Sequence, residues 1–457
     1  METLDQQMRQ KWWNEIQDAL LNEQIDQFRA EFLELHPYDQ AQIFLEQSKE
    51  IRLLIYTYLS PDEMAEVLEN IDYEDINSIL TEMDPRFASQ ILGEMATDDA
   101  VDVLNALDKN EVASFLTIMD KESAEEIKDL LHYEEKTAGS IMTTEFVAVR
   151  ASMAIREAML HLRKEAPEAE TIYYIYVIDG EKHLVGVISL RDLIIAEEDW
   201  VIRDVMSDRI VAAQASEDQE DVARMMRDYD LLALPVVDFQ NHLLGIITVD
   251  DIIDVMEEEA SEDYSKLAGV SDKETPNMNA LEAAKKRLPW LLILLFLGLF
   301  TASLIGRFEE TLDKVAILAI FIPLIAGMAG NTGTQALAVA VRSIATGDSE
   351  KDGISKLLLR EAGTGFITGT CSGIVITIVI YVWKGSIYLG ILVGISIMLT
   401  LIVATLAGAF IPLLMHKMKI DPAVASGPFI TTINDIISIL IYFGMATTFM
   451  DFLIKTS

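Results

Sequence analysis

Five long apolar stretches in the second half of the chain limit its fold more than any other feature. They cover residues 288–306, 315–341, 362–383, 385–415 and 422–450. About 20 consecutive apolar residues cross the hydrocarbon core of a bilayer as a helix, and runs of this length are unusual in soluble domains. We therefore predict a five-helix α-helical transmembrane domain over 287–457.

Asp435 is the only charged residue within these predicted spans. A carboxylate at the centre of a bilayer costs roughly 2.5–3.5 kcal/mol on insertion scales. No span offers a basic residue for a structural salt bridge, so the sequence favours a ligand in an ion pathway. Thr431, Thr432 and Asn434 precede it, and oxygen ligands suit a hard cation such as Mg²⁺.

The second predicted span and the later glycines carry further signals. Span two contains Pro323 and the polar, glycine-rich run 327–335, which predicts a helix break lining a cavity. Glycines that recur every four residues predict closely packed membrane helices. They are Gly365, Gly369 and Gly373, followed by Gly390 and Gly394.

The net charge divides the chain into two halves. All of the net charge of −39 lies in the first 288 residues, because the rest carries ten basic and ten acidic residues. Such a surface repels nucleic acid and attracts cations. Nine basic residues flank the spans on one side and four on the other. This asymmetry predicts a multi-pass protein of a bacterial-type plasma membrane, with the N-terminal half cytoplasmic and the C-terminus outside.

A 12-residue repeat fills residues 61–132, beginning PDEMAEVLENID and YEDINSILTEMD. Positions 4, 7 and 11 are apolar in all six copies, which is a helical stripe. Position 12 is Asp in four copies, where it can cap the next helix. The repeat predicts an all-α solenoid within a helical N-domain over 1–135.

Residues 138–258 alternate β-rich runs with helical patterns, and this α+β region repeats once. The segment 186–192, GVISLRD, corresponds to 245–251, GIITVDD. The Ser or Thr and the Asp of each copy stand near a helix start, where they can hold a ribose or simply cap the helix. The repeat predicts one domain over 136–200 and another over 201–258.

A strongly acidic helix follows, with eight carboxylates and no basic residue within 14 positions from Asp250 to Asp263. Together with its connector, over 250–286, it leads directly to the first span. A solvated acidic face and a cation-sensing lever are both compatible with this pattern.

These features together resemble the MgtE family of magnesium channels over nearly the whole chain. The motifs that carry the resemblance are YYIYVID, GVISLRDLI, GIITVDDIIDVMEEEASED, GNTGTQ and PFITTINDIISILIYF. The resemblance implies a helical N-domain, tandem CBS domains, an acidic plug helix and the membrane domain. Three positions depart from the usual family pattern, namely Ala329, Gly427 and Ser438.

The resemblance also implies a homodimer in the lipid bilayer, with Asp435 in a pore that holds hydrated Mg²⁺. It implies that cytoplasmic Mg²⁺ gates the pore through acidic sensor residues. These are Asp98 and Asp102 in the N-domain, and Asp251, Asp254, Glu259, Glu262 and Asp263 on or beside the plug helix. Asp192 resembles a nucleotide contact, with Tyr173 or Tyr174 near the base, which makes ATP a possible modulator.

Other functions are less consistent with the sequence. No His-Glu-x-x-His, Gly-x-Ser-x-Gly or Gly-Lys-Ser/Thr motif occurs, so we predict neither an enzyme nor a P-loop pump. A regulated transporter of Mn²⁺ or Co²⁺, and a cation receptor without transport, remain alternatives.

Overall fold

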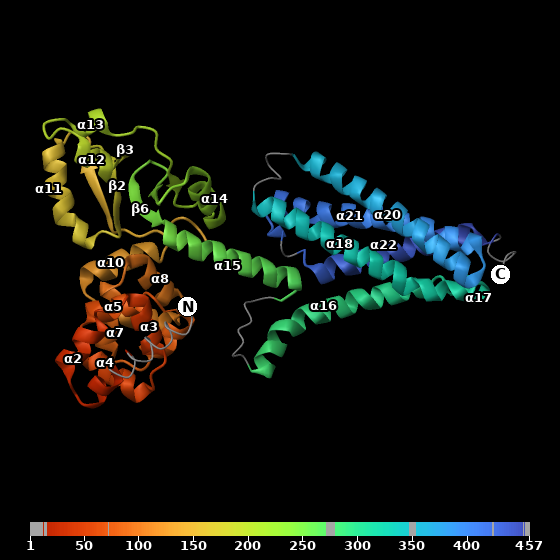
Figure 1. The fold of residues 1–457 in the computed structure, drawn as a ribbon, viewed down its shortest axis with the longest axis horizontal. Coiled ribbons are helices and arrows are strands. Elements are labelled where there is room, and N and C mark those ends of the chain that lie inside the picture. The colour runs from red at the N-terminus through yellow and green to blue at the C-terminus, as the bar shows by residue number, and fades with distance from the viewer. Residues whose placement is uncertain are drawn as a thin grey trace. The chain divides into compact units, whose positions relative to one another are not determined.

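The computed structural model describes residues 12, 16–71, 73–270, 279–346, 353–422, 425–450 and 452. The chain forms two compact units, Met1–Val255 and Met256–Ser457. In the first unit, short helices precede two small sheets, and the second is a bundle of long helices (Figure 1). The predicted fold class is confirmed.

The first unit begins with a stack of short helices that share one apolar core. The six helices of the repeat start at residues 61, 73, 85, 97, 109 and 121, which are the first positions of the six predicted copies. Each helix is amphipathic and too short to bury its own apolar face, so stacking supplies the core. Three helices precede the repeat: α2 (Ile25–Phe32), α3 (Pro37–Leu45) and α4 (Lys49–Tyr58). The repeat helices are α5 (Pro61–Leu68), α6 (Tyr73–Leu80), α7 (Pro85–Glu94), α8 (Thr97–Asn105), α9 (Lys109–Ile118) and α10 (Lys121–Leu130).

Two of the four aspartates that end a repeat cap the following helix through their side chains, as predicted. Asp84 accepts a hydrogen bond from the Arg86 N–H at 2.9 Å. Asp120 accepts from the N–H groups of Glu122 and Ser123 at 2.9 and 3.2 Å. These carboxylates satisfy N–H groups that the first helical turn leaves unpaired. Asp72, another repeat-ending aspartate, lies outside the described residues.

Two three-stranded sheets follow, and each has one parallel and one antiparallel pairing. The matching topology confirms that the region is an internal repeat. The strands are β1 (Phe146–Arg150), β2 (Thr171–Ile178), β3 (Leu184–Ser189), β4 (Ala213–Gln214), β5 (Ala233–Val237) and β6 (Leu243–Thr248). The helices are α11 (Ile155–Glu165), α12 (Leu190–Ile195), α13 (Ile202–Val205) and α14 (Gln219–Tyr229), with a 3₁₀ turn at Ala166–Glu168.

The two repeats exchange their leading segments. Thr143 bridges to Ile246 of β6, and Ser207 bridges to Val187 of β3. Gly186 and Gly245 make this approach possible. A Cβ at Gly245 would stand 2.5 Å from the Thr143 carbonyl oxygen, and one at Gly186 would stand 2.3 Å from the sulfur of Met206.

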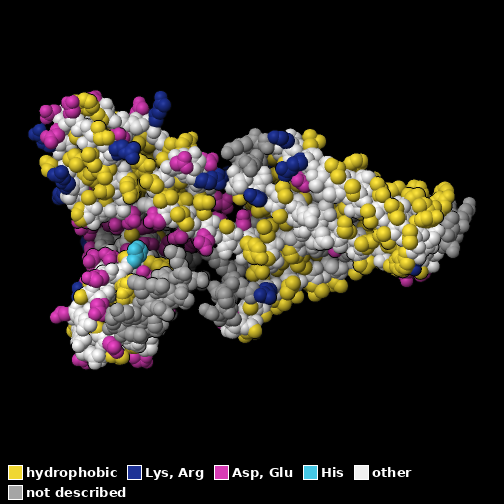
Figure 2. All heavy atoms as spheres, viewed as in Figure 1, with side chains coloured by type: hydrophobic (Ala, Val, Ile, Leu, Met, Phe, Trp, Pro, Cys, Tyr) yellow, Lys and Arg dark blue, Asp and Glu magenta, His cyan; other side chains and the backbone are white. Residues whose placement is uncertain are grey.

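The acidic helix α15 (Val249–Ala268) leaves the second sheet and continues into the second unit. Five helices of the described residues are long and apolar enough to cross a membrane, as predicted. Figure 2 shows hydrophobic side chains spread over the visible face of this helical unit. The helices are α16 (Ala280–Gly306), α18 (Ile322–Ala345), preceded by a 3₁₀ segment (Ala316–Phe321), α20 (Ile354–Lys384), α21 (Ile387–Lys417) and α22 (Gly427–Thr448), with a short α17 (Glu309–Lys314) after α16.

The helix break predicted at 327–335 is wrong. α18 is a continuous α-helix over 322–345, and the irregular backbone lies before it, in the 3₁₀ segment. Pro323 occupies the first turn, where its missing N–H is no loss. The glycines of the run serve close packing between helices: a Cβ at Gly333 would stand 1.9 Å from Nδ2 of Asn434.

The third predicted span began too late, at residue 362. α20 starts at Ile354 and carries Arg360 and Glu361 within the helix. Glu361 is buried, whereas its neighbour Arg360 keeps a half-exposed side chain. Asp435 is therefore not the only carboxylate in the long helices.

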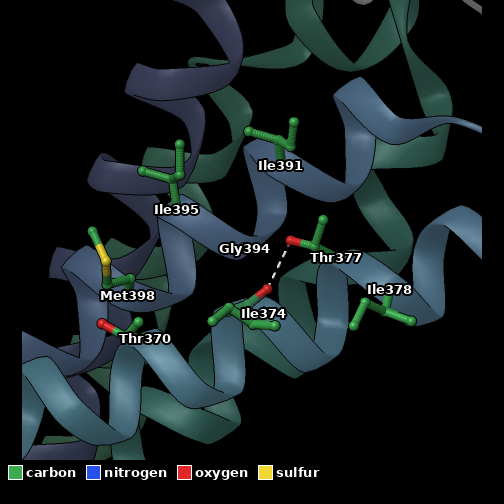
Figure 3. A pocket seen from close by; sticks show the side chains of 9 residues that line it. Thr370, Ile374, Thr377, Ile378, Ile391, Gly394, Ile395 and Met398 are labelled. Atoms are coloured by element: carbon green, nitrogen blue, oxygen red, sulfur yellow. Dashed lines mark hydrogen bonds between the residues drawn. The ribbon is translucent and has the colours of Figure 1, made fainter.

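The predicted close packing of α20 and α21 through glycine is confirmed. Cβ atoms at Gly365, Gly369 and Gly373 would each meet α21 backbone within 3.0 Å. The Thr377 hydroxyl lies 2.7 Å from the Gly373 carbonyl, a hydrogen bond drawn as a dashed line in Figure 3. The same hydroxyl lies 2.9 Å from the Gly390 carbonyl. An apolar groove of about 270 Å³ lies along this contact, and Ile374, Ile391 and Met398 are among its lining residues.

Candidate ion pathway and acidic regulatory sites

Helix α22 presents Asp435 from its third turn. Pro428 lies in the first turn, and the Ser426 hydroxyl caps the helix by accepting from the Phe429 N–H at 3.4 Å. The Asp435 side chain is partly exposed, and no basic side chain among the described residues forms an ion pair with it. An uncompensated carboxylate on an apolar helix requires water or a cation.

The residues around Asp435 are held by close packing with α18. Cβ atoms at Gly330 and Gly333 would stand 3.1 and 1.9 Å from side-chain atoms of Thr431 and Asn434. Asn434 donates to the Ala329 carbonyl at 3.5 Å, while its own carbonyl oxygen is buried with no hydrogen-bond partner in the described structure. α18 and α22 together therefore place carboxylate, amide and hydroxyl oxygens along one contact.

The first unit gathers carboxylates from three parts of the chain. Asp98, in the first turn of α8, and Asp251, in the first turn of α15, raise each other's energy by charge repulsion. Oδ1 of Asp98 is buried and has no hydrogen-bond partner within the described residues. Burial, followed by the charges of Asp251 and Asp99, raises the pKa of Asp98 well above its usual value. Thr248 donates to Oδ2 of Asp251 at 2.5 Å, and burial still raises the pKa of Asp251 to about 6.

The sequence patterns did not predict several members of this cluster of carboxylates. Burial, with the charge of Glu69 next in importance, raises the pKa of Asp99 to about 8. Burial and the charge of Glu170 raise the pKa of Glu145 to about 7. The adjacent pair Asp98-Asp99 was a visible signal, but Glu69, Glu145 and Glu170 carry none, because only the fold brings them together.

The other predicted sensor residues are dispersed. Asp102 lies one turn beyond Asp98 and is exposed, and its charge contributes to the raised pKa of Asp99. Asp254 is exposed on α15.

The C-terminal half of α15 forms a separate charged site within the second unit. Lys266 lies 2.5 Å from Glu262 and 2.5 Å from Asp421, which precedes α22. Burial, and then the charge of Asp421, raises the pKa of Asp263 to about 6, with a smaller contribution from Glu259. The predicted sensor residues Glu262 and Asp263 thus interact with Lys266, which the charge pattern alone did not indicate, and Glu259 acts on Asp263 through its charge.

No three acidic, histidine or cysteine side chains of the described residues converge as a ready metal cage. Mg²⁺ keeps several waters and needs only one or two protein carboxylates. The pair Asp98 and Asp251, with its orphaned oxygen, fits such a hydrated ion.

The candidate nucleotide residues are partly explained by helix capping. The Ser189 hydroxyl accepts from the Asp192 N–H at 3.1 Å and lies 2.6 Å from Oδ2 of Asp192. Tyr174 pairs with Ser189 across β2 and β3, whereas Tyr173 is 63% exposed. Adjacent strand residues point to opposite faces, so only one of the two tyrosines shares a face with Ser189.

Comparisons with known families identify the regions of the chain. The family model for the MgtE intracellular N domain matches residues 35–136, and that for CBS domains matches 138–199 and 202–258. The model described as a divalent cation transporter matches 322–445, which includes Asp435 and Glu361. The chain is therefore a multi-pass transporter of the divalent-cation class, with CBS domains in its soluble half.

Full-length relatives narrow this class to one family. The chain is 53% identical to the magnesium transporter MgtE of Enterococcus faecalis over 96% of this chain and 97% of that protein. It is 42% identical to the Bacillus subtilis protein of the same name, over 93% and 94% of the two chains. The chain belongs to the MgtE family of magnesium transporters. Matches to inosine-5′-monophosphate dehydrogenases cover between 17% and 43% of the chain, through the CBS domains, and the family is not one of enzymes.

Solved structures match the soluble half. The soluble part of a magnesium transporter is 49% identical, with a TM-score of 0.54, and covers 55% of this chain and 99% of that chain. The cytosolic domain of the Mg²⁺ channel MgtE in complex with ATP is 39% identical, with a TM-score of 0.51, over 53% and 99%. The family is thus one of multi-pass membrane proteins with a cytosolic N-terminal half.

Proposed function

We propose that this chain conducts Mg²⁺ through the plasma membrane along a pathway that uses Asp435. The observation that carries the proposal is a carboxylate on a membrane helix, with oxygen-bearing neighbours and no basic partner among the described residues. A hydrated Mg²⁺ ion supplies the missing positive charge, and its coordinated waters donate hydrogen bonds to such oxygens.

The conducting form is a homodimer in the lipid bilayer. No residue of α16 is buried, although the helix is strongly apolar from Leu288 to its end at Gly306. A membrane helix with no buried face is available to lipid and to a second copy. A two-fold assembly also brings two Asp435 carboxylates to one axis, where together they balance a divalent ion.

Cytoplasmic Mg²⁺ regulates this pathway through the acidic residues of the first unit and the plug helix. Asp98 and Asp251 repel each other, and a cation between them removes that repulsion and stabilises the compact form. Asp102 and Asp254 extend this negative surface, while Glu259, Glu262 and Asp263 act near Lys266 in the second unit. We assign the compact, Mg²⁺-bound form to the closed channel, with the N-terminal half in the cytoplasm and the C-terminus outside.

ATP is a second ligand of the CBS region in this proposal. The support is the ATP complex of the 39% identical cytosolic domain. Asp192 is the ribose contact and one of Tyr173 and Tyr174 lies beside the base. When the nucleotide binds, the Asp192 carboxylate exchanges the hydrogen bond that it accepts from Ser189 for one from a ribose hydroxyl.

Mg²⁺ uptake into liposomes that contain the full-length protein tests the conducting role. Asp435→Asn keeps the side-chain shape and removes the charge, and we expect it to abolish uptake. Glu310→Gln, on an exposed position of α17, is the matched control and should transport normally. Normal uptake by Asp435→Asn rejects the pathway, and absence of uptake by the unmodified protein favours a cation receptor. Equal transport of Mn²⁺ and Co²⁺ favours the broader divalent transporter.

A further inference from the structure

A groove lined mostly by polar residues lies between α18 and α20, and Thr405 of α21 also lines it. Its volume is about 450 Å³, and the side chain of Glu361 is only 8% exposed beside it. The remaining lining residues are mostly hydroxyl or amide side chains: Thr332, Gln335, Thr364, Thr368 and Thr405, with Arg360, Ala336 and Val339 completing the lining.

Arg360 forms only a weak ion pair with Glu361. The guanidinium of Arg360 lies 3.3 Å from Oε1, from the adjacent residue of the same helix. Charge-assisted hydrogen bonds of this type are usually 2.7–2.9 Å. The Arg360 side chain is also 58% exposed and is free to turn toward water. A nearly buried carboxylate therefore stands at an accessible groove with a weak and displaceable counter-ion.

We propose that this groove is a binding site for a hydrated divalent cation, separate from the contact around Asp435. Mg²⁺ is the cation that the family transports, and its six waters occupy roughly 180 Å³, which the groove can hold. Glu361 supplies the charge. Gln335 and Thr332 on one wall and the threonines on the other accept hydrogen bonds from the coordinated waters.

The charge of the groove selects among possible occupants. An anionic lipid headgroup would meet the Glu361 carboxylate, and an apolar segment would leave that carboxylate without solvation. A divalent cation gains from Glu361 and displaces Arg360 toward solvent. The site lies eight residues into α20, after a loop that the basic-residue pattern places in the cytoplasm. It would therefore hold ions near the cytoplasmic end of the membrane helices.

Residue-specific labelling of the full-length protein in lipid nanodiscs tests this site. A water-soluble carbodiimide with an amine nucleophile modifies accessible carboxylates, and peptide mass spectrometry measures the rate at Glu361 and at the exposed control Glu310. At a Mg²⁺ concentration about four times the dissociation constant, about one fifth of the site is free, so labelling of Glu361 should slow roughly fivefold. Labelling of Glu310 should not change, and Na⁺ at equal ionic strength should not protect Glu361.

Arg360 variants separate a cation site from a structural ion pair. Arg360→Gln removes the competing positive charge, so the Mg²⁺ concentration that half-protects Glu361 should fall roughly tenfold. Arg360→Lys keeps the charge and should remain near the unmodified protein. Because Arg360 belongs to this groove, its effect also distinguishes local binding from protection by a Mg²⁺-driven closure elsewhere.

Three results would overturn the proposal. Labelling of Glu361 at one rate with and without Mg²⁺ means that no cation binds there. No labelling under either condition means that water does not reach the groove. An unchanged or higher protective concentration in Arg360→Gln means that Arg360 and Glu361 form a structural pair and that protection arises at a distance.

Discussion

Replacing Glu145 with Gln should stabilise the first unit at alkaline pH and leave it nearly unchanged in acid. The pKa of Glu145 is about 7 in the folded chain, against 4.5 for an ordinary glutamate, because of burial and then the charge of Glu170. The folded state therefore binds more protons than the unfolded state between these two values. The contribution of Glu145 to the free energy of unfolding is fully present below pH 4.5 and is lost as the pH rises through 7.

The structure sets the size of this effect. At about 1.36 kcal/mol per pH unit, the ionised Glu145 costs the folded state about 3 kcal/mol at pH 8. Neighbouring charges share this cost and the side chain is partly solvated, so we expect a gain of roughly 1–3 kcal/mol from Glu145→Gln. The glutamine amide keeps an oxygen that can accept the hydrogen bond from Thr97 that glutamate receives.

Urea unfolding of residues 1–255 in EDTA, followed by circular dichroism at pH 5 and pH 8, measures the prediction. A relative's soluble part has been crystallised on its own, so this unit is a suitable object. Glu135→Gln, on an exposed loop, is the control for loss of a surface charge. An equal change in unfolding free energy at both pH values, or a loss of stability at pH 8, would refute the reasoning.

Two further perturbations act on the membrane unit. Gly333→Ala should lower the melting temperature in detergent, because its Cβ would stand 1.9 Å from Nδ2 of Asn434. Gly298→Ala is the control and should melt like the unmodified protein, since its Cβ would meet nothing within 4 Å. Similar melting temperatures for the two variants would contradict the packing argument. Lys266→Met removes the ammonium group that lies 2.5 Å from Asp421. We therefore expect faster proteolysis after α15 in EDTA, and slower proteolysis again when Mg²⁺ is added. Unchanged digestion would show that the ion pair does not hold this end of the helix.

The sequence predicted the elements whose causes are local. Each repeat helix begins where its 12-residue copy begins, because an apolar stripe and a capping aspartate specify a short helix without distant contacts. The five membrane helices were equally visible from length and composition. Asp435 was found because a carboxylate is conspicuous in an apolar span.

The sites that depend on distant contacts were harder to predict. Asp98 and Asp251 were selected through a family resemblance, whereas their mutual repulsion and the participation of Asp99 and Glu145 come from the fold. Glu361 was missed because hydropathy ends a span at the first charged residue. A helix continues through such a residue when neighbouring helices and a counter-ion accommodate it.

The polar run 330–335 in α18 acquires a different meaning from this structure. Successive residues of an α-helix turn by about 100°, so Thr332 and Gln335 lie about 200° from Gly330 and Gly333 respectively. The two glycines accordingly pack against α22 near Asp435, while Thr332 and Gln335 line the groove beside Glu361. One unbroken helix thus contacts both carboxylate sites through opposite faces. A break at this run would separate the two faces, whereas the continuous α18 holds both as parts of one helix.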